Sequence, residues 1–460
     1  MNNERHMGRK KLNVWDATSI VIGVVIGSGI FLVPSNIAAA VGTPAALILV
    51  WIVAGVLSLF GALSYAELGA LFPQAGGQYA YLKEAYGALW GFLYGWSLFW
   101  VAQSGSIAAV AVGFATYLGY FVPSHGTLVE FAWPVQIAIT ENQLWAAGLV
   151  AVLTAVNYIG LKYGALVQNA FTLMKSLACL AIVFLGCAGG ARPIASFFAG
   201  GSAPSGALAF TSAFGVALVA ALWALDGWNN VTFISGEAQS PRRTIPLALL
   251  LGTAGIVAIY LLMNVAYLRV LDIGQIASSE RIAADAMQTV IGGRGASLIA
   301  VFILISTFGC VNGMILAAAR VYQAQAEDGL FPRRMAEIHP RFATPGFALV
   351  TQGIWSALLA LSGRYDQLFT FAIFALWIFY GMSVAAIFIF RRRGLQAAGY
   401  RVWAYPVVPG LFVLLCAGLL VNTLIETPWE SLIGTGLILA GLPAYYWYAR
   451  RKPDDRHERR

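Results

Sequence analysis

Two glycine-rich stretches hold the residues of this 460-residue chain that are best suited to binding chemistry. The first, residues 23–31, reads GVVIGSGIF, and the second, residues 223–230, reads WALDGWNN. Both interrupt apolar runs that are long enough to cross a bilayer, so they predict helices that unwind partway through. Where a helix unwinds, backbone amides and carbonyls lose their partners four residues away and become available to a ligand.

The two predicted breaks offer complementary groups for a zwitterion. The amides of Ser28, Gly29 and Ile30 open a new half-helix, whose positive dipole end favours a carboxylate. The carbonyls that end the preceding half-helices suit an ammonium group, and they belong to Val25, Trp223 and Asp226. Together these groups predict a site for a free α-amino acid.

Helix packing is the alternative role for the first stretch. Gly23 and Gly27 form a G-x-x-x-G step, which often mediates close helix contacts in membranes. The second stretch interrupts the corresponding span about 200 residues later, and it carries an acid at membrane depth. Matched interruptions in two halves of a chain point to a transport site near the bilayer midplane, so binding is favoured over packing.

Charged residues inside apolar spans also need a chemical reason, because a charge at the bilayer centre costs about 2.5–3.5 kcal/mol on insertion scales. Lys175 lies deep in a span, where its ammonium could take the place of a bound cation at the helix breaks. Since burial penalises the charged form of a lysine, it is also a candidate proton carrier. Asp226 could brace the second break, pair with Lys175 or contact a cationic substrate side chain, and the sequence leaves these three open.

Other charged and aromatic residues stand near span ends or beside the breaks. Asp16 and Glu237 lie near helix ends, where either gating salt bridges or simple capping explains them, and Glu67 is expected to be structural. Trp223 and Trp228 flank the second break, where a bulky aromatic side chain could close over a substrate as an outer gate.

The elements that position these residues follow from composition. Hydrophobic residues make up 59% of the chain and charged residues 10%, with a mean hydropathy of +0.75, which excludes an ordinary soluble enzyme. The apolar residues predict twelve transmembrane helices, at 14–40, 45–71, 88–121, 143–161, 165–189, 209–235, 245–270, 294–322, 345–362, 367–390, 404–425 and 430–449. The breaks fall in the first and sixth spans. A five-plus-five inverted repeat produces this pattern, with halves at about 14–189 and 209–390 followed by two further helices at 404–449.

The basic residues predict the orientation of these helices. With both ends in the cytoplasm, the inner loops and tails, including an expected tail at 453–460, hold 22 of the Lys and Arg residues, and the outer loops hold five. The net charge of +8 thus follows membrane topology and forms no continuous basic face for nucleic acid. We expect short surface helices in the outer segments 122–142, 190–208 and 271–293, with one at 283–291, and interfacial helices in the inner segments 73–86 and 320–345. The four cysteines lie in apolar spans without metal-ligand spacing, so no metal, cofactor or disulfide framework is expected.

Four motifs, in order, resemble the amino acid–polyamine–organocation superfamily over nearly the whole chain. They are residues 23–31, residues 73–81 (PQAGGQYAY), residues 223–246 with WALDGW, GE and PRRTIP, and residues 319–332 with ARVY and EDGLFP. Within the superfamily, the D-G-W sequence and the lysine in the fifth span resemble the L-amino acid transporter branch and its bacterial members. The resemblance implies an all-α LeuT fold with discontinuous helices 1 and 6, and sodium-independent exchange of L-amino acids by alternating access.

The resemblance also implies roles for individual residues. It assigns the substrate carboxylate to Ser28, Gly29 and Ile30, and the amine to the carbonyls of Val25, Trp223 and Asp226, with Trp223 as a gate. Asn229 matches a polar position near the substrate, Lys175 matches the lysine that replaces the second sodium site, and Ser306 and Thr307 match hydroxyls beside it. Four neighbours complete the predicted substrate-binding set: Gly27, Ala224, Gly227 and Trp228.

Two departures from the family pattern bear on partners and substrates. Residues 122–142 contain no cysteine, so a disulfide-linked heavy-chain subunit is not expected, and the expected partners are free L-amino acids and the lipid bilayer. The loop after the sixth span reads Gly236-Glu237 where partnered animal relatives carry two acids. This favours a bacterial inner-membrane exchanger of small neutral amino acids, although Asp226 leaves cationic substrates open.

Three other functions compete with exchange. A proton-coupled amino acid importer, with Lys175 carrying the proton, is the close rival. A membrane-embedded enzyme is disfavoured because no H-E-x-x-H or G-x-S-x-G motif appears. A channel is disfavoured because the predicted site would bind and occlude a zwitterion, whereas conduction needs several weak sites along a continuous pore.

Overall fold

The fold was analysed in a computed structural model of the chain. The structure describes residues 12–73, 76–123, 126–131, 137–159, 164–198, 200–362, 365–397 and 399–450. The expected cytoplasmic tail at 453–460 lies outside the described residues.

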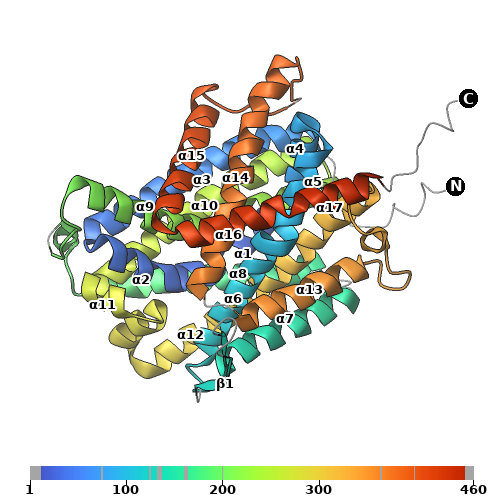
Figure 1. Ribbon diagram of the computed structural model, residues 1–460. Coiled ribbons are helices and arrows are strands. Elements are labelled where there is room, and N and C mark those ends of the chain that lie inside the picture. Colours follow the sequence, from blue (N-terminus) through green and yellow to red (C-terminus); the bar gives the residue numbers. More distant parts are fainter. Residues whose placement is uncertain are drawn as a thin grey trace, which may run out of the picture.

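The described chain is mainly helical (Figure 1). Its first half contains α1 (Val14–Val25), α2 (Gly29–Val41), α3 (Pro44–Leu71), α4 (Gln78–Tyr86), α5 (Ala88–Ser97), the π-helix η1 (Leu98–Ala102), α6 (Gln103–Leu118), strands β1 (Thr127–Phe131) and β2 (Ile137–Thr140), α7 (Glu141–Ile159) and α8 (Gly164–Gly189). The second half contains η2 (Ile194–Phe198), α9 (Ala207–Ala224), η3 (Trp228–Glu237), α10 (Pro241–Val270), α11 (Ile273–Ser278), α12 (Ile282–Glu327), η4 (Arg333–Ala336), α13 (Gly346–Ser362) and α14 (Tyr365–Arg392). Three helices follow: α15 (Val407–Glu426), α16 (Pro428–Leu439) and α17 (Gly441–Arg450).

The helices identify a multi-pass membrane protein. Nine spans in the described ranges are long and apolar enough to cross a bilayer, and a tenth is added if the bent pair α1 and α2 is one crossing. α3, with 28 residues, is about 42 Å long and exceeds a hydrocarbon core of about 30 Å. Two further predicted crossings are not matched by a single long helix: α13 has 17 residues, and the last span divides into α16 and α17, with 12 and 10. The count of twelve crossings therefore remains a prediction.

Helix starts follow local capping rules. Asn13 accepts hydrogen bonds from the amides of Trp15 and Asp16, while the Asp16 carboxylate accepts from the Asn13 amide, which closes a capping box at α1. Thr43 caps α3 through the Ala46 amide. These caps satisfy amides that a helix cannot pair by itself, so α1 and α3 begin where the sequence supplies an acceptor.

The packing places the predicted breaks at the centre of the molecule. α3 packs on α10, α1 packs on α10 and α8, and α2 packs on α9. On another side, α6, α7, α12 and α13 pack on one another, and α12 also contacts α1, α2 and η3. The segment between α1 and α2 and the segment between α9 and η3 thus lie between these two groups of helices.

The connecting segments match the sequence expectations in part. The surface helix expected at 283–291 is confirmed as the first part of α12, which then changes direction at Gly292. The inner segment 73–86 contains α4, and the segment 320–345 contains the end of α12 and η4. The helix expected in 122–142 is wrong: β1 and β2 form an antiparallel hairpin there, in which β-branched residues such as Val129 and Ile139 pair across the strands.

Candidate functional site at the two helix breaks

The first break is a real interruption between α1 and α2, which are inclined by 45° to each other. Ile26 ends α1 with a non-helical ψ of 84°, and the Gly27 amide turns back to the Val25 carbonyl at 2.7 Å. The following amides precede the first complete turn of α2 and therefore lack a helical acceptor. They belong to Ser28, Gly29 and Ile30, as the sequence predicted.

Lys175 orders the carbonyl side of this break. α8 brings its Nζ to 2.5 Å from the Gly23 carbonyl oxygen and 2.9 Å from that of Ile26, at the end of α1. The same ammonium lies 3.3 Å from the Ser306 carbonyl oxygen on α12, and the Ser306 hydroxyl donates to the Ile26 carbonyl at 3.1 Å. The lysine side chain is 1% exposed. One buried cation thus joins α1, α8 and α12 through backbone oxygens.

Other donors engage the remaining carbonyls at the end of α1. The Cys310 thiol donates to the Val24 carbonyl at 2.9 Å, and the Tyr260 hydroxyl donates to the Val25 carbonyl at 3.0 Å. The Val25 oxygen, expected to hold a substrate amine, therefore already accepts bonds from Tyr260 and Gly27. Thr307, expected beside Lys175, donates to the Ile303 and Leu304 carbonyls of its own helix.

The second break follows the end of α9 at Ala224. The Asp226 amide donates to the Trp223 carbonyl at 3.1 Å, and Gly227 has a φ of 101°, a region that favours glycine. Asp226 Oδ1 accepts a hydrogen bond from the Tyr380 hydroxyl on α14 at 2.7 Å. Asp226 therefore braces the unwound segment against α14 and does not pair with Lys175.

A chain of polar groups continues from this brace toward α4. The Tyr380 hydroxyl also lies 3.1 Å from Asn229 Oδ1, and Asn229 Nδ2 donates to Gln78 Oε1 at 3.3 Å. Gln78 is the first residue of α4. The second break is thereby connected to the helix that follows α3.

The two breaks touch each other. A Cβ atom added to Gly29 would lie 2.7 Å from the Ala224 Cα, and one added to Gly227 would lie 2.8 Å from Val24 Cγ1. Real Cβ atoms do not approach other atoms this closely, so glycine is required for the unwound backbones to meet.

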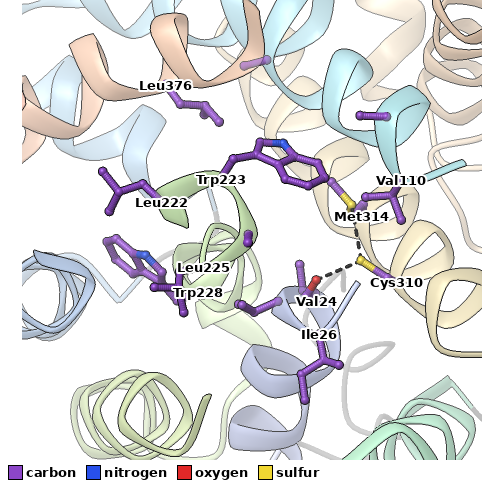
Figure 2. Close-up of a cluster of buried hydrophobic side chains, with 14 of the residues drawn as sticks. Val24, Ile26, Val110, Leu222, Trp223, Leu225, Trp228, Cys310, Met314 and Leu376 are labelled. Carbon is purple, nitrogen blue, oxygen red and sulfur yellow. Dashed lines mark hydrogen bonds between the residues drawn. The ribbon is translucent and has the colours of Figure 1, made fainter. Parts of the chain in front are cut away.

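A small cavity opens where the breaks meet. Eight of the predicted substrate-binding residues line it: Val25, Gly27, Ser28, Gly29, Trp223, Ala224, Asp226 and Gly227. Figure 2 shows Trp223 pointing from the second break toward Met314 and Val110. The cavity therefore has backbone from both breaks on one side and side chains of α6 and α12 on the other.

Three predicted binding residues lie away from the cavity. Trp228 packs edge-on against Tyr65 at 5.0 Å between ring centroids, and Figure 2 places it on the opposite side of the break from Trp223. Asn229 points to Tyr380, and Ile30 is buried in the core. Trp228 and Asn229 begin the 3-10 helix η3, which directs their side chains to Tyr65 and Tyr380, whereas Asn230 in the same helix lines the cavity.

Seven cavity residues were not in the set predicted from the sequence: Val24, Gln103, Ser106, Val110, Asn230, Cys310 and Met314. Gln103 and Ser106 are polar residues in an otherwise apolar span, directly after the π-helix η1, and that pattern was the available signal. Cys310 and Met314 look like ordinary core residues in sequence, and only the packing of α12 against the first break brings them to the cavity.

Two hydroxyls facing this region lack a partner. Ser28 Oγ and Ser106 Oγ are buried, and neither makes a hydrogen bond within the described structure. A buried hydroxyl without a partner costs free energy, which a polar ligand could recover by bonding to it. The cavity thus combines helix-terminus amides, a carboxylate and unpaired hydroxyls, and it suits a small polar molecule.

The acids near the helix ends have separate roles. Asp16 caps α1 and also accepts from the Asn169 side chain at 2.9 Å. Glu237, at the end of η3, pairs with Arg320 on α12 at 3.3 Å, which keeps the gating interpretation for this residue. Glu67 forms two hydrogen bonds with Arg391, at 2.9 and 2.7 Å, and so has the expected structural role.

A further ion pair joins α4 to α12 outside the spans. Lys83 Nζ lies 2.6 Å from Asp328 Oδ2, and the Tyr79 hydroxyl donates to the same oxygen at 2.5 Å. Burial and the bond to Asp328 raise the pKa of Tyr79, so this hydroxyl remains a donor at physiological pH. Among the described residues, no group of three or more His, Cys, Asp or Glu side chains is placed to hold a metal ion.

Comparisons with known proteins find relatives along nearly the whole chain. Residues 12–447 match the family described as amino acid permease. The chain is 32% identical to the serine/threonine exchanger SteT of Bacillus subtilis (strain 168), covering 98% of this chain and 100% of the relative. It is 30% identical to the human b(0,+)-type amino acid transporter 1, covering 96% and 89% of the two chains. The human cystine/glutamate transporter is 28% identical, with 96% and 85% covered.

Proposed function

The chain belongs to the amino acid permease family, and from this premise we propose that it is a sodium-independent exchanger of free L-amino acids. Its family and relatives are transporters, not enzymes. The observation that carries the proposal is the cavity at which two unwound helices present free amides and an acid. Such a site binds and occludes a zwitterion, and the helix segments around it are the parts that alternating access moves.

The proposed substrate lies with its carboxylate at the start of α2. The amides of Ser28 and Gly29, which line the cavity, receive it, since the helix dipole favours negative charge there. The amine lies toward the second break, where the Asp226 carboxylate supplies negative charge. The Trp223 and Val25 carbonyls contribute less, because the Asp226 amide already donates to the first, and Tyr260 and Gly27 already donate to the second.

Lys175 supports sodium independence. Its ammonium already satisfies carbonyls of α1 and α12 that would otherwise attract a metal cation. The protein therefore needs no sodium ion to hold the first break in shape. A proton-coupled importer remains the second candidate, because the same buried lysine is a group whose proton could leave during the cycle.

The cavity favours small, polar, neutral amino acids. Ser106 and Gln103 on α6 face the space left for the substrate side chain, while Val110, Met314 and Trp223 restrict its size. The likeness to a serine/threonine exchanger supports the same substrate class. A cationic substrate would have to compete with Tyr380 for the Asp226 carboxylate.

The proposal includes a twelve-helix LeuT-type architecture with both ends in the cytoplasm. Its repeats are residues 14–189 and 209–390, and α15 to α17 follow them. The bend between α1 and α2 and the interruption after α9 support the repeat, and the 22-to-5 distribution of basic residues supports the orientation in a bacterial inner membrane. We further propose that it works without a disulfide-linked heavy chain; Cys179, Cys187, Cys310 and Cys416 carry free thiols in α8, α12 and α15.

Transport by purified protein in liposomes tests the proposal. Radiolabelled serine is supplied outside in sodium-free buffer, with and without unlabelled serine inside, at matched pH and then across a pH gradient. If the protein is an exchanger, uptake depends on the amino acid inside the vesicles and does not change with the pH gradient. Uptake into empty vesicles driven by an acidic exterior would identify a proton-coupled importer, and flux that never saturates would identify a channel. Competition by lysine or arginine would establish a cationic substrate.

A further inference from the structure

A second cavity lies far from the helix breaks, between α7 and α13. These helices lie side by side at the surface of the helix assembly (Figure 1). The groove between them holds about 1190 Å³ of empty space, and Thr154 and Tyr158 are the only two of its lining residues with polar side-chain atoms. Small residues such as Ala155 and Ala357 form its walls. A groove this apolar on a membrane-crossing helix is suited to hydrocarbon.

One end of the groove is covered by the loop that precedes α13. The Thr344 hydroxyl donates to the Tyr158 carbonyl at 2.9 Å, which fixes the loop on the end of α7. The rings of His339 and Phe342 lie 5.4 and 5.9 Å from the Tyr158 ring, which itself lines the groove. Arg341 is exposed beside them, with its Cζ atom 5.5 Å from the Phe342 ring centroid.

This loop presents positively charged and donor groups at the groove. His339 Nδ1 accepts bonds from the amides of Arg341 and Phe342, at 3.3 and 3.2 Å, so its ring proton is on Nε2. Arg341, two residues after His339, adds an exposed guanidinium beside this ring. An anionic group at this end of the groove would therefore meet one arginine and a fixed imidazole donor.

We propose that the groove between α7 and α13 binds one anionic phospholipid. Its acyl chain lies along α7 from Tyr158 toward Ala151, a distance of roughly 10 Å at 1.5 Å per residue. Its phosphate lies at Arg341, whose guanidinium forms paired hydrogen bonds with phosphate oxygens, and at His339 Nε2. The apolar groove selects for hydrocarbon and the basic loop selects for negative charge, and this combination distinguishes an anionic lipid from a zwitterionic one.

Native mass spectrometry of the purified, full-length protein tests this site without reference to transport. Phosphatidylglycerol is titrated into the detergent-solubilised protein, and phosphatidylcholine with the same acyl chains is titrated in parallel. We expect a one-to-one complex with phosphatidylglycerol at a concentration about tenfold lower than phosphatidylcholine requires, because the phosphate contacts are charge-assisted in both lipids but only phosphatidylglycerol has a net charge. Equal affinity for the two lipids would overturn the proposal.

Two variants separate the headgroup from the acyl chain. The double variant His339→Gln, Arg341→Gln should remove the preference for phosphatidylglycerol, whereas Ala155→Phe should fill the groove and weaken both lipids. Arg243→Gln, an exposed arginine at the start of α10, makes a matched change of charge and should keep the preference. Loss of the preference in Arg243→Gln, or unchanged binding in Ala155→Phe, would overturn the site. A protein dimer that Ala155→Phe dissociates would instead make the groove a contact between two copies of the chain.

Discussion

The two helix breaks line one cavity, but a cationic side chain holds the first break and an anionic side chain belongs to the second. At the first break, the ammonium of Lys175 is shared by the carbonyls of Gly23, Ile26 and Ser306, so one group ties α1 directly to α8 and α12. At the second break, the Asp226 carboxylate accepts from the Tyr380 hydroxyl, and further links through amide side chains lead to α4. At the first break one buried ammonium contacts three carbonyls, and side chains of Ser306, Cys310 and Tyr260 add bonds to the same end of α1, whereas the second break is held by a series of separate bonds.

The two breaks therefore differ in how strongly hydrogen bonds hold them in place. Hydrogen bonds to a charged group contribute about 1.5–3 kcal/mol, and three converge on one ammonium at the first break. The links beyond Tyr380 at the second break join neutral groups, each of which contributes about 1 kcal/mol. We therefore expect the first break to keep its shape through the transport cycle and the second break, with its attached α4, to move. The experiments below test this ranking.

The largest effect is expected from Lys175→Ala. The substitution removes the ammonium that donates to the buried carbonyls of Gly23 and Ser306. Each carbonyl that loses its hydrogen bond costs about 1–3 kcal/mol of folding free energy. Turnover in liposomes should fall about 100-fold, while substrate binding, measured by thermal stabilisation of the purified protein, is partly retained. An unchanged rate and pH profile would remove the lysine from the mechanism and with it the difference between the breaks.

Gly29→Ala should reduce uptake about tenfold, through an overpacking cost of about 1–3 kcal/mol. The new Cβ would lie 2.7 Å from the Ala224 Cα, and backbone cannot give way as a flexible side chain does. Gly255→Ala on α10 is the matched control, because nothing lies within 4 Å of its added Cβ. Equal uptake by the two variants would mean that the breaks do not need their close contact.

Tyr380→Phe sharpens the comparison at the second break. It removes the hydroxyl that Asp226 accepts but keeps the ring beside Trp228, at 5.6 Å between centroids. We expect uptake to fall about tenfold, the effect of losing one hydrogen bond to a charged group at the lower end of about 1.5–3 kcal/mol. Tyr94→Phe is the control, since its buried hydroxyl has no partner. A loss as large as that of Lys175→Ala would reverse the ranking of the two breaks.

The smallest effect concerns substrate choice alone. Ser106→Ala removes an unpaired hydroxyl that faces the cavity, so serine should lose about threefold in apparent affinity relative to alanine, from a bond of about 0.5–1.5 kcal/mol. Competition of each amino acid with radiolabelled substrate measures the ratio. Ser104→Ala, which only loses a bond to the Phe99 carbonyl of its own helical region, should leave the ratio unchanged. The same ratio in both variants would exclude Ser106 from the side-chain site.

Much of the site could be read from the sequence because its chemistry is carried by backbone. Glycine content and apolar length predicted the breaks, and eight of the predicted binding residues line the cavity. Trp228 and Asn229 were predicted in the site because they adjoin the second break. They lie outside it because η3 directs their side chains to Tyr65 and Tyr380, and sequence adjacency does not reveal which residues of that helix face the cavity.

The sequence by itself determined the membrane class, the positions of the two breaks and the buried lysine. Apolar length, glycine conformational freedom and the cost of a buried charge are local properties, and they act on each segment independently. Tertiary structure alone decided the partners: Asp226 meets Tyr380 rather than Lys175, and Gln103, Cys310 and Met314 reach the cavity. These contacts depend on how helices far apart in the chain cross and rotate against each other, and no local pattern encodes that geometry.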